Sequence, residues 1–334
     1  MKILLCGYYG FKNTGDEAIC LAITRELTRL GHTVTVLSAN PAETAALYGV
    51  KAVKRMSPLE TPLAILNSDV VLSGGGGLLQ DKTSSRTLSY YLGIIGLAKI
   101  LGKRVAVFNQ SIGPLSTQGQ TRVAASLRGV TSIVRDSGSF ALLEKLGVAV
   151  QLGGDPALLL EKPVGITQNP NQILIAPREG QAAATDCLVE LAKKLVQQGK
   201  SIVALGFQPG WDDDELKAFE GIPNTAIENT ANPARALELI ASSGAVIGVR
   251  LHAVILAAAA RVPFYGISYD PKVQGFCRDV SALELPTSFD IGVLETAILK
   301  NDQPNWEAVE AMKTRARASF AWALEPVLHG RSSA

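Results

Sequence analysis

The sequence predicts an α/β protein built from two Rossmann-like domains that face each other across a cleft. Short runs rich in valine and isoleucine alternate with longer helical patterns along the whole chain. The chain has 334 residues, more than one ordinary hydrophobic core organises. A polar segment with two prolines, EKPVGITQNPNQ at 161–172, interrupts the alternation and marks the expected boundary between the domains.

The expected strands are runs that are apolar on both faces, as in buried parallel sheets. They cover 2–7, 33–38, 69–73, 104–109, 131–135, 149–152, 173–176, 201–206, 244–249 and 264–268. The N-terminal domain is therefore expected over 1–162 and the C-terminal domain over 172–303. The remaining segment, 304–334, is expected to form a helix to about 328 and a tail, with the helix packing back on the first domain.

Composition and charge exclude several classes of protein. Hydrophobic residues make up 47% and charged residues 19%, which argues against disorder. A net charge of +2 gives no reason to expect a nucleic-acid partner. The four cysteines are widely scattered and form no Cys/His cluster, so neither a disulfide framework nor a metal site is expected.

A cytoplasmic location is expected. The first apolar run is too short for the core of a signal peptide, and the most apolar stretch, 88–101, falls short of a membrane span. The positive mean hydropathy of +0.20 is compatible with peripheral contact at the inner face of a membrane.

The first loop, GFKNTGD at 10–16, has the glycine spacing of a phosphate-binding P-loop. Asp16 and Glu17 stand where such a loop has Lys and Ser or Thr, so it is not a working Walker A loop. In one interpretation Asp16 caps the helix that follows. In the other, Asn13 or Asp16 contacts a sugar hydroxyl while the glycines allow close approach. Both remain open from the sequence.

Two further loops follow expected strands. Four glycines, 74–77, follow the strand at 69–73. Four glycines in a row cost backbone conformational entropy on folding, so a tight turn alone explains them poorly. We therefore favour close approach of a ligand at Gly75 and Gly76. The polar residues 109–111 follow the strand at 104–109, where an ordinary turn at Gly113 and Pro114 is nearly as good an explanation.

Three arginines are more informative, because each directly follows an expected buried strand. They are Arg135, Arg178 and Arg250. Ligands of such sheets bind at the carboxyl ends of the strands, and guanidinium groups match phosphate and carboxylate geometry. A small molecule with two or three negative charges is the expected ligand. Leu251 and His252 follow Arg250 at the start of a helix, where a histidine can donate a proton near neutral pH.

These motifs resemble those of the polysaccharide pyruvyl transferase family, and most closely its CsaB-type bacterial members. The segments that carry the resemblance are GYYGFKNTGDEA, VVLSGGGGLLQD, QSIGPL, VRDSGS, GGDPALLL, APREG and GVRLHAVILA, in this order between Met1 and about Asp279. The RLH triplet at 250–252 and the GDEA opening are the most specific of them.

The resemblance implies a fold like that of GT-B glycosyltransferases and a transfer of pyruvate from phosphoenolpyruvate to two hydroxyls of one sugar. The product is a cyclic ketal and phosphate is released, with no metal and no cofactor. The implied acceptor is a lipid-linked cell-wall polysaccharide precursor with N-acetylmannosamine, whose ketal anchors S-layer-homology domains.

The resemblance maps the family's donor-binding arginine to Arg135 and its RLH triplet to 250–252, and the residue patterns described above suggest the remaining roles. Arg135, Arg250 and Leu251 would bind phosphoenolpyruvate together with Arg178, and His252 would be the catalytic acid. The N-terminal domain would hold the acceptor, with Asn13, Asp16, Gly75 and Gly76 as its binding residues. Two alternatives remain: a glycosyltransferase of the same fold that uses a nucleotide sugar, and a sugar-binding protein without catalysis.

Overall fold

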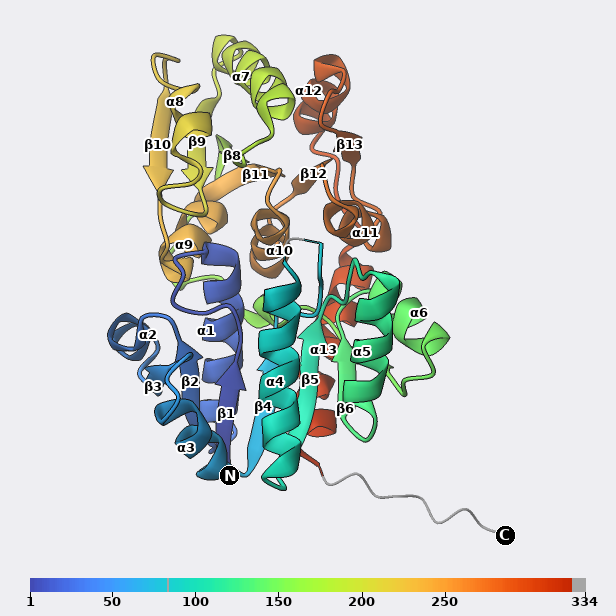
Figure 1. The fold of residues 1–334 in the computed structure, drawn as a ribbon. Helices are drawn as coiled ribbons and strands as arrows, with labels where there is room; N and C mark the ends of the chain where they lie inside the picture. Colours follow the sequence, from blue (N-terminus) through green and yellow to red (C-terminus); the bar gives the residue numbers. More distant parts are fainter. Residues whose placement is uncertain (83, 326–334) are drawn as a thin grey trace. The chain divides into compact units, whose positions relative to one another are not determined.

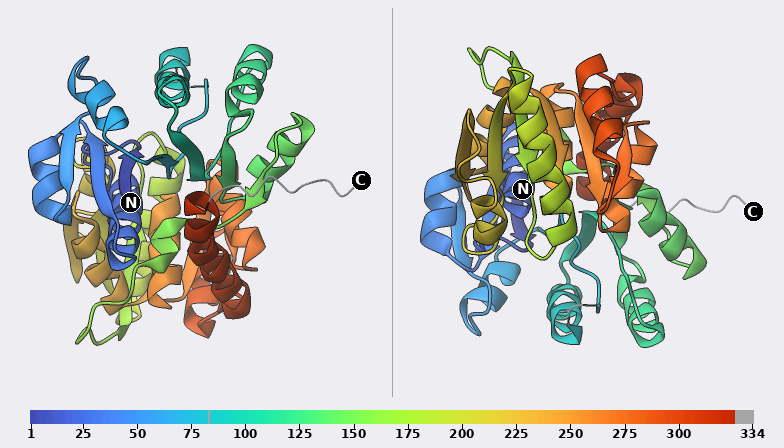
Figure 2. Two further views of the ribbon diagram at one scale, coloured as in Figure 1. Left: turned by 90° about the horizontal axis from the view of Figure 1, so that it is seen from below. Right: turned by 90° about the horizontal axis from the view of Figure 1, so that it is seen from above.

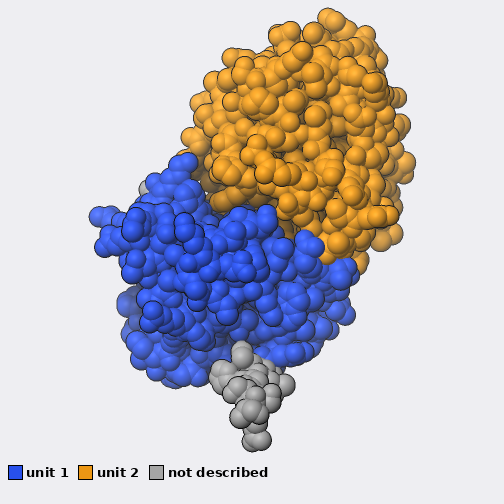
Figure 3. All heavy atoms as spheres, turned by 90° about the vertical axis from the view of Figure 1, so that its right-hand side faces the viewer, with its two compact units in different colours: residues 1–8, 24–154, 314–334 blue, residues 9–23, 155–313 orange. Residues whose placement is uncertain are grey.

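The computed structural model describes residues 1–82 and 84–325. Contacts between residues divide the chain into two compact units, coloured separately in Figure 3. Unit 1 comprises Met1–Tyr8, Thr24–Gly154 and the chain from Thr314, and unit 2 comprises Tyr9–Ile23 and Asp155–Lys313.

Unit 1 is built on a seven-stranded parallel sheet of order β3-β2-β1-β4-β5-β6-β7. The order reverses between β1 and β4, as in a Rossmann fold. Its strands are β1 (Lys2–Cys6), β2 (Thr33–Ser38), β3 (Lys51–Lys54), β4 (Val70–Gly74), β5 (Arg104–Gln110), β6 (Thr131–Val134) and β7 (Gln151–Leu152).

Helices cover this sheet, and Figure 1 labels them in chain order. Helices α3 to α6 pack on one face through Ile65, Ile95, Val123 and Leu143, which belong to one buried cluster with the strands. These helices are blue to green in Figure 2. The helices with residues in unit 1 are α1 (Thr14–Arg29), α2 (Pro41–Tyr48), α3 (Glu60–Leu66), α4 (Ser85–Ile100), α5 (Thr117–Leu127), α6 (Ser137–Lys145) and α13 (Trp306–Leu324).

Unit 2 repeats the same design with a six-stranded parallel sheet of order β10-β9-β8-β11-β12-β13. Here the order reverses between β8 and β11. Its strands are β8 (Asn169–Ala176), β9 (Ser201–Gly206), β10 (Thr225–Asn229), β11 (Ser243–Gly248), β12 (Phe264–Ser268) and β13 (Glu284–Pro286).

The helices of unit 2 include α10, whose residues Ala253–Ala260 are all buried. A helix that is apolar all round belongs in a core. Its first turn follows β11 directly, so the core fixes the place of Arg250 and His252. The helices are η1 (Pro156–Leu159), α7 (Ala182–Gln197), α8 (Asp213–Lys217), α9 (Pro233–Ser242), α10 (Leu251–Ala260), α11 (Pro271–Asp279) and α12 (Ile291–Lys300).

The division of the chain differs in places from the ranges expected from the sequence. The first unit ends at Gly154 and not at 162, and Tyr9–Ile23 group with the second unit. Helices α1 and α13 each contribute residues to both units. The last helix runs from Trp306 to Leu324, and the expected positions 326–328 lie outside the described residues.

Candidate active site

Three side chains of unit 2 come from the carboxyl ends of neighbouring strands. Arg178 follows β8, Arg250 follows β11 and Tyr269 follows β12. Because β8 and β11 are the two strands between which the order reverses, the crevice at their carboxyl ends is where ligands bind in such sheets. Two of the three arginines singled out from the sequence therefore lie at the expected binding edge of one unit.

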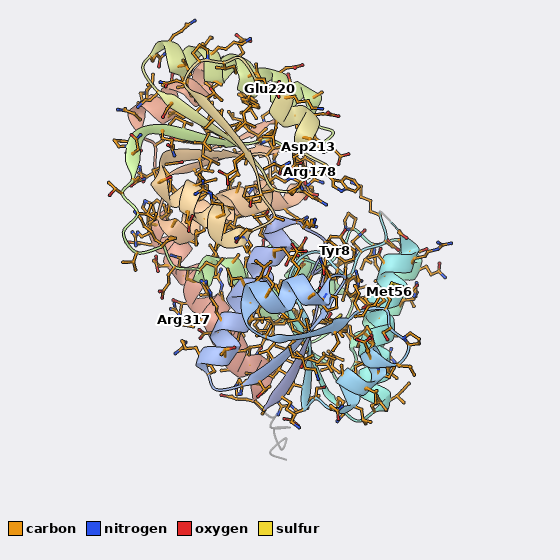
Figure 4. The ribbon with its side chains drawn as sticks, turned by 90° about the vertical axis from the view of Figure 1, so that its left-hand side faces the viewer. Tyr8, Met56, Arg178, Asp213, Glu220 and Arg317 are labelled. Carbon is orange, nitrogen blue, oxygen red and sulfur yellow. The ribbon has the colours of Figure 1, made fainter. Side chains whose placement is uncertain are left out.

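Arg178 contacts the ring of Tyr269. Its guanidinium carbon lies 4.3 Å from the ring centroid, and Nη1 donates a hydrogen bond to the phenol oxygen. Burial raises the pKa of Tyr269, while the positive charges of Arg178 and Arg250 act in the opposite direction. The phenol thus stays neutral at physiological pH and holds the guanidinium in place. Figure 4 labels Arg178 and Asp213, which both belong to unit 2.

Arg250 is paired with a carboxylate that the sequence analysis did not single out. Asp212 is fully buried, and its Oδ1 accepts hydrogen bonds from Nη2 of Arg250 and from the amide of Glu179 at 3.1 Å. Its Oδ2 accepts from the amides of Phe207 and Gln208, at 2.9 and 3.0 Å. One carboxylate therefore joins the loops after β8, β9 and β11.

Arg250 keeps donor capacity beyond this pair. Its side chain is 9% exposed, and Nε is buried without a hydrogen-bond partner among the described residues. Nη1 lies 3.5 Å from the side-chain oxygen of Gln208, which is a long hydrogen bond. A buried guanidinium with an unsatisfied N–H is suited to an anionic ligand, because leaving such a donor unpaired is unfavourable.

His252 lies in the first turn of α10, next to Arg250 in the sequence. Its Nε2 is 3.6 Å from Oδ2 of Asp155, which is too long for a hydrogen bond but within range of an ion pair with a protonated imidazole. Nε2 is buried and has no hydrogen-bond partner within residues 1–82 and 84–325. Asp155 is 4% exposed, and its Oδ1 accepts from the amide of Ala157 at 2.9 Å, which fixes the carboxylate.

The first loop of the chain packs directly on this histidine. A Cβ added to Gly15 would lie 2.6 Å from Cγ of His252 and closer still to Nδ1. The preceding Thr14 donates from its amide to Phe207 O at 2.8 Å and from its hydroxyl to Thr230 O. These bonds explain why the loop, expected in the first domain, groups with unit 2.

The two acidic residues of the loop have different places. Asn13 caps α1, since its Oδ1 accepts from the amides of Gly15 and Asp16 at 3.0 and 3.4 Å. The interpretation of Asp16 as the cap is therefore wrong, and Asp16 lies half-buried in the first turn. Glu17 is buried, and its Oε1 accepts from the amide of Gly10 at 2.8 Å, closing the loop. Acceptor contacts of Asn13 and Asp16 stay a prediction.

Gly75 and Gly76 form a turn after β4 in unit 1. Both have positive φ, 71° and 69°, which favours glycine. The amide of Gly75 donates to Phe108 O at 3.0 Å, and Gly76 O accepts from the amide of Ser111 at 2.9 Å. The backbone conformation and these bonds account for both glycines, and their contact with an acceptor stays a prediction.

Arg135 lies after β6 in unit 1. Its Nε donates to Ser111 Oγ at 2.8 Å, and that hydroxyl donates to Asp136 Oδ2 at 2.6 Å. Asp136 also caps α6 through the amide of Ser139. Arg135 is thus oriented by its neighbours. The three expected donor arginines come from both units, one from unit 1 and two from unit 2.

Asn109 and Gln110, the last two residues of β5, are buried and hydrogen-bonded within unit 1. Asn109 is fully buried with φ of 53°, and its Oδ1 accepts from Gly154 N and Ser319 Oγ at 3.3 and 3.1 Å. Gln110 is also buried, and its amide donates to Ser73 O at 2.6 Å. Both side chains link the end of β5 to neighbouring segments of unit 1 through these hydrogen bonds.

Residues 1–82 and 84–325, which the structure describes, contain no group of three or more His, Cys, Asp or Glu side chains placed to hold a metal ion. Within the same residues, no helix combines the length and the apolar character needed to cross a membrane.

The family model for "Polysaccharide pyruvyl transferase" matches residues 13–271. The chain belongs to the polysaccharide pyruvyl transferase family. The matched range includes every arginine and histidine described above and begins at the cap of α1. A comparison of the chain with curated proteins found no significant match.

Solved structures confirm the expected fold class of two Rossmann-like domains. A glycosyltransferase from Rickettsia africae is 14% identical with a TM-score of 0.56, covering 96% of this chain and 93% of that chain. UDP-GlcNAc 2-epimerase from Neisseria meningitidis, bound to UDP-GlcNAc, is 15% identical with a TM-score of 0.61 and 97% coverage of both. MurG from Acinetobacter baumannii is 14% identical with a TM-score of 0.51 and 95% coverage of both. At these identities the likeness concerns the fold alone.

Proposed function

We propose that the protein transfers pyruvate from phosphoenolpyruvate to two hydroxyls of one sugar, forming a cyclic ketal and releasing phosphate. Membership of the pyruvyl transferase family supports the reaction class. The observation that carries the donor assignment is the pairing of Arg250 and His252 at the start of α10, with an unsatisfied buried N–H on the arginine.

The donor site is assigned to the carboxyl edge of unit 2. Phosphoenolpyruvate carries a phosphate and a carboxylate, and Arg178 and Arg250 follow the two central strands. The first amides of α10, including that of Leu251, add partial positive charge at the same place. Asp212 neutralises only part of this charge. Arg135 is assigned to the same ligand on the strength of the motif it shares with the family.

His252 is assigned as the general acid. Protonation of C3 of phosphoenolpyruvate by the imidazolium leaves a cation at C2, which the first sugar hydroxyl attacks with loss of its proton. The C2–O bond to phosphate then breaks and inorganic phosphate leaves. The second hydroxyl attacks C2, loses its proton and closes the ketal. Asp155, fixed by Ala157 N, lies where it pairs with the charged form of the imidazole.

The acceptor is proposed to be a lipid-linked saccharide with N-acetylmannosamine, the cell-wall precursor that anchors S-layer-homology domains once it is pyruvylated. Such an acceptor lies at a membrane, so the enzyme would work in the cytoplasm in peripheral contact with the inner face. Asn13, Asp16, Gly75 and Gly76 remain the proposed acceptor residues. No metal or cofactor is part of this proposal.

Thermal unfolding in the presence of ligands tests the donor assignment. A ligand that binds only the folded state raises the melting temperature. Phosphoenolpyruvate should raise it in a saturable manner, whereas UDP and UDP-N-acetylglucosamine should not. Stabilisation by the nucleotides alone would favour a nucleotide-sugar transferase, and stabilisation by saccharides alone a binding protein without catalysis.

A further inference from the structure

Trp211 exposes a large apolar ring at the binding edge of unit 2. Its exposed fraction is 57%, and it is the only aromatic residue among the exposed large hydrophobic side chains of the described residues. It lies between β9 and α8, immediately before Asp212. Leaving an indole in water forgoes favourable burial, so its exposure beside a binding site calls for an explanation.

The turn that carries Trp211 is firmly held. The amides of Trp211 and Asp212 both donate to Gln208 O, at 3.0 and 3.1 Å. Asp212 is anchored by the amides of Phe207 and Gln208. Asp213 Oδ1 accepts from the amide of Gly210 at 3.3 Å. The backbone that carries the indole is therefore held in place, so no ordering of this loop is needed when a ligand settles on the ring.

The same turn lies against the loop that carries Arg178. The amide of Glu179 donates to Asp212 at 3.1 Å, and the amide of Gly180 donates to Glu215 Oε1 at 2.8 Å. Arg250 bonds to the neighbouring Asp212. Trp211 therefore belongs to a loop that is bonded to the loop of Arg178, and it directly precedes the carboxylate partner of Arg250 in the sequence.

We propose that Trp211 is a stacking platform for a pyranose ring of the saccharide acceptor. The inference rests on the proposed function, since it places a sugar beside the donor arginines. The C–H face of a pyranose is apolar and packs on an indole, while its hydroxyls remain at the rim and can reach C2 of the donor. An anionic donor gains more from the arginines than from a neutral ring.

Steady-state kinetics with the full-length protein test this role. Trp211→Ala should raise the acceptor KM about tenfold, the equivalent of one stacked ring, and leave the KM for phosphoenolpyruvate unchanged. Trp211→Phe keeps an aromatic face, so its acceptor KM should lie between those of the unaltered protein and Trp211→Ala. Val293→Ala is the matched control, because Val293 is 46% exposed on α12 and lies outside the site. An unchanged acceptor KM in Trp211→Ala would overturn the proposal.

A binding measurement separates this inference from the transfer reaction. The double variant Trp306→Phe, Trp322→Phe leaves Trp211 as the only tryptophan. Methyl glycosides of N-acetylmannosamine, N-acetylglucosamine, glucose and galactose are titrated against its fluorescence. A saturable change with any of them supports the platform even if no pyruvate is transferred. No saturable change with all four contradicts it, even if phosphoenolpyruvate stabilises the protein.

Discussion

Gly15 and His252 touch so closely that residue 15 has no room for a side chain. A Cβ there would stand 2.6 Å from the imidazole Cγ, well inside van der Waals contact. The glycine of the P-loop-like opening therefore makes room for a histidine of unit 2. Glu17, at the position of the P-loop Ser or Thr, turns back and accepts a hydrogen bond from the amide of Gly10.

Gly15→Ala should displace the imidazole. Overpacking of this kind typically destabilises by about 1–3 kcal/mol, and a shift of the acid by an ångström lowers turnover about a hundredfold. Gly275→Ala in α11 is the control, because a Cβ there meets no atom within 4 Å. Gly275→Ala should leave the free energy of unfolding unchanged or raise it. Urea unfolding gives the stability of both variants, and a kinetic assay gives their turnover. Equal stability and equal turnover in the two variants would refute the contact between residue 15 and His252.

His252→Ala and His252→Gln should lower turnover by about 10²–10⁴-fold while phosphoenolpyruvate still binds, because neither side chain delivers a proton. Single-turnover rates and calorimetric titration with phosphoenolpyruvate measure the two effects on one preparation. If the histidine only packs α10, both variants will instead melt earlier and keep most of their rate at low temperature. Near-normal turnover in the Gln variant would end the assignment as acid.

Asp212→Asn should destabilise the protein by about 3–5 kcal/mol, because it leaves the buried guanidinium of Arg250 without a counter-charge. Asp214→Asn is the matched control. Asp214 is 87% exposed and paired with Lys217, so its loss should leave stability nearly unchanged. Urea denaturation measures the free energy of unfolding of both variants. A similar small loss in both would mean that Asp212 does not hold Arg250.

Arg250→Ala and Arg135→Ala should each weaken phosphoenolpyruvate binding about tenfold to a hundredfold, since a charge-assisted hydrogen bond contributes about 1.5–3 kcal/mol. Arg178→Ala should act in the same direction. Arg235→Ala is the control: Arg235 is ion-paired with Glu228 and Glu238 on the surface of α9. Calorimetric titration gives the affinities. Unchanged binding in both the Arg250 and Arg135 variants would remove these arginines from the donor site.

Strand prediction succeeded where the strand is buried on both faces and failed at edges. The central strands β1, β4, β8 and β11 read as continuous apolar runs, and their bounds were expected to within a few residues. Three of the four edge strands, β3, β10 and β13, were missed, whereas the fourth, β7, was expected at 149–152. Their burial patterns are mixed, as in KAVK and TAIEN, because one side lacks a partner or a covering helix.

The site was only partly predictable for a related reason. Arg250 and His252 stand out because they follow a long apolar strand directly. Asp212 does not, since the run DDD reads as a solvated surface, and its burial depends on bonds to three loops far apart in sequence. The grouping of Tyr9–Ile23 with unit 2 likewise depends on Phe207 and Thr230, which no local pattern indicates.

The central claim is pyruvyl transfer to a sugar, and mass spectrometry of the product tests it most directly. The protein is incubated with phosphoenolpyruvate and a lipid-linked saccharide containing N-acetylmannosamine, and phosphate release is followed in parallel. The account predicts a saccharide carrying one pyruvate ketal and one phosphate released per ketal. An unmodified saccharide with intact phosphoenolpyruvate, alongside turnover of a nucleotide sugar by the same preparation, would contradict it.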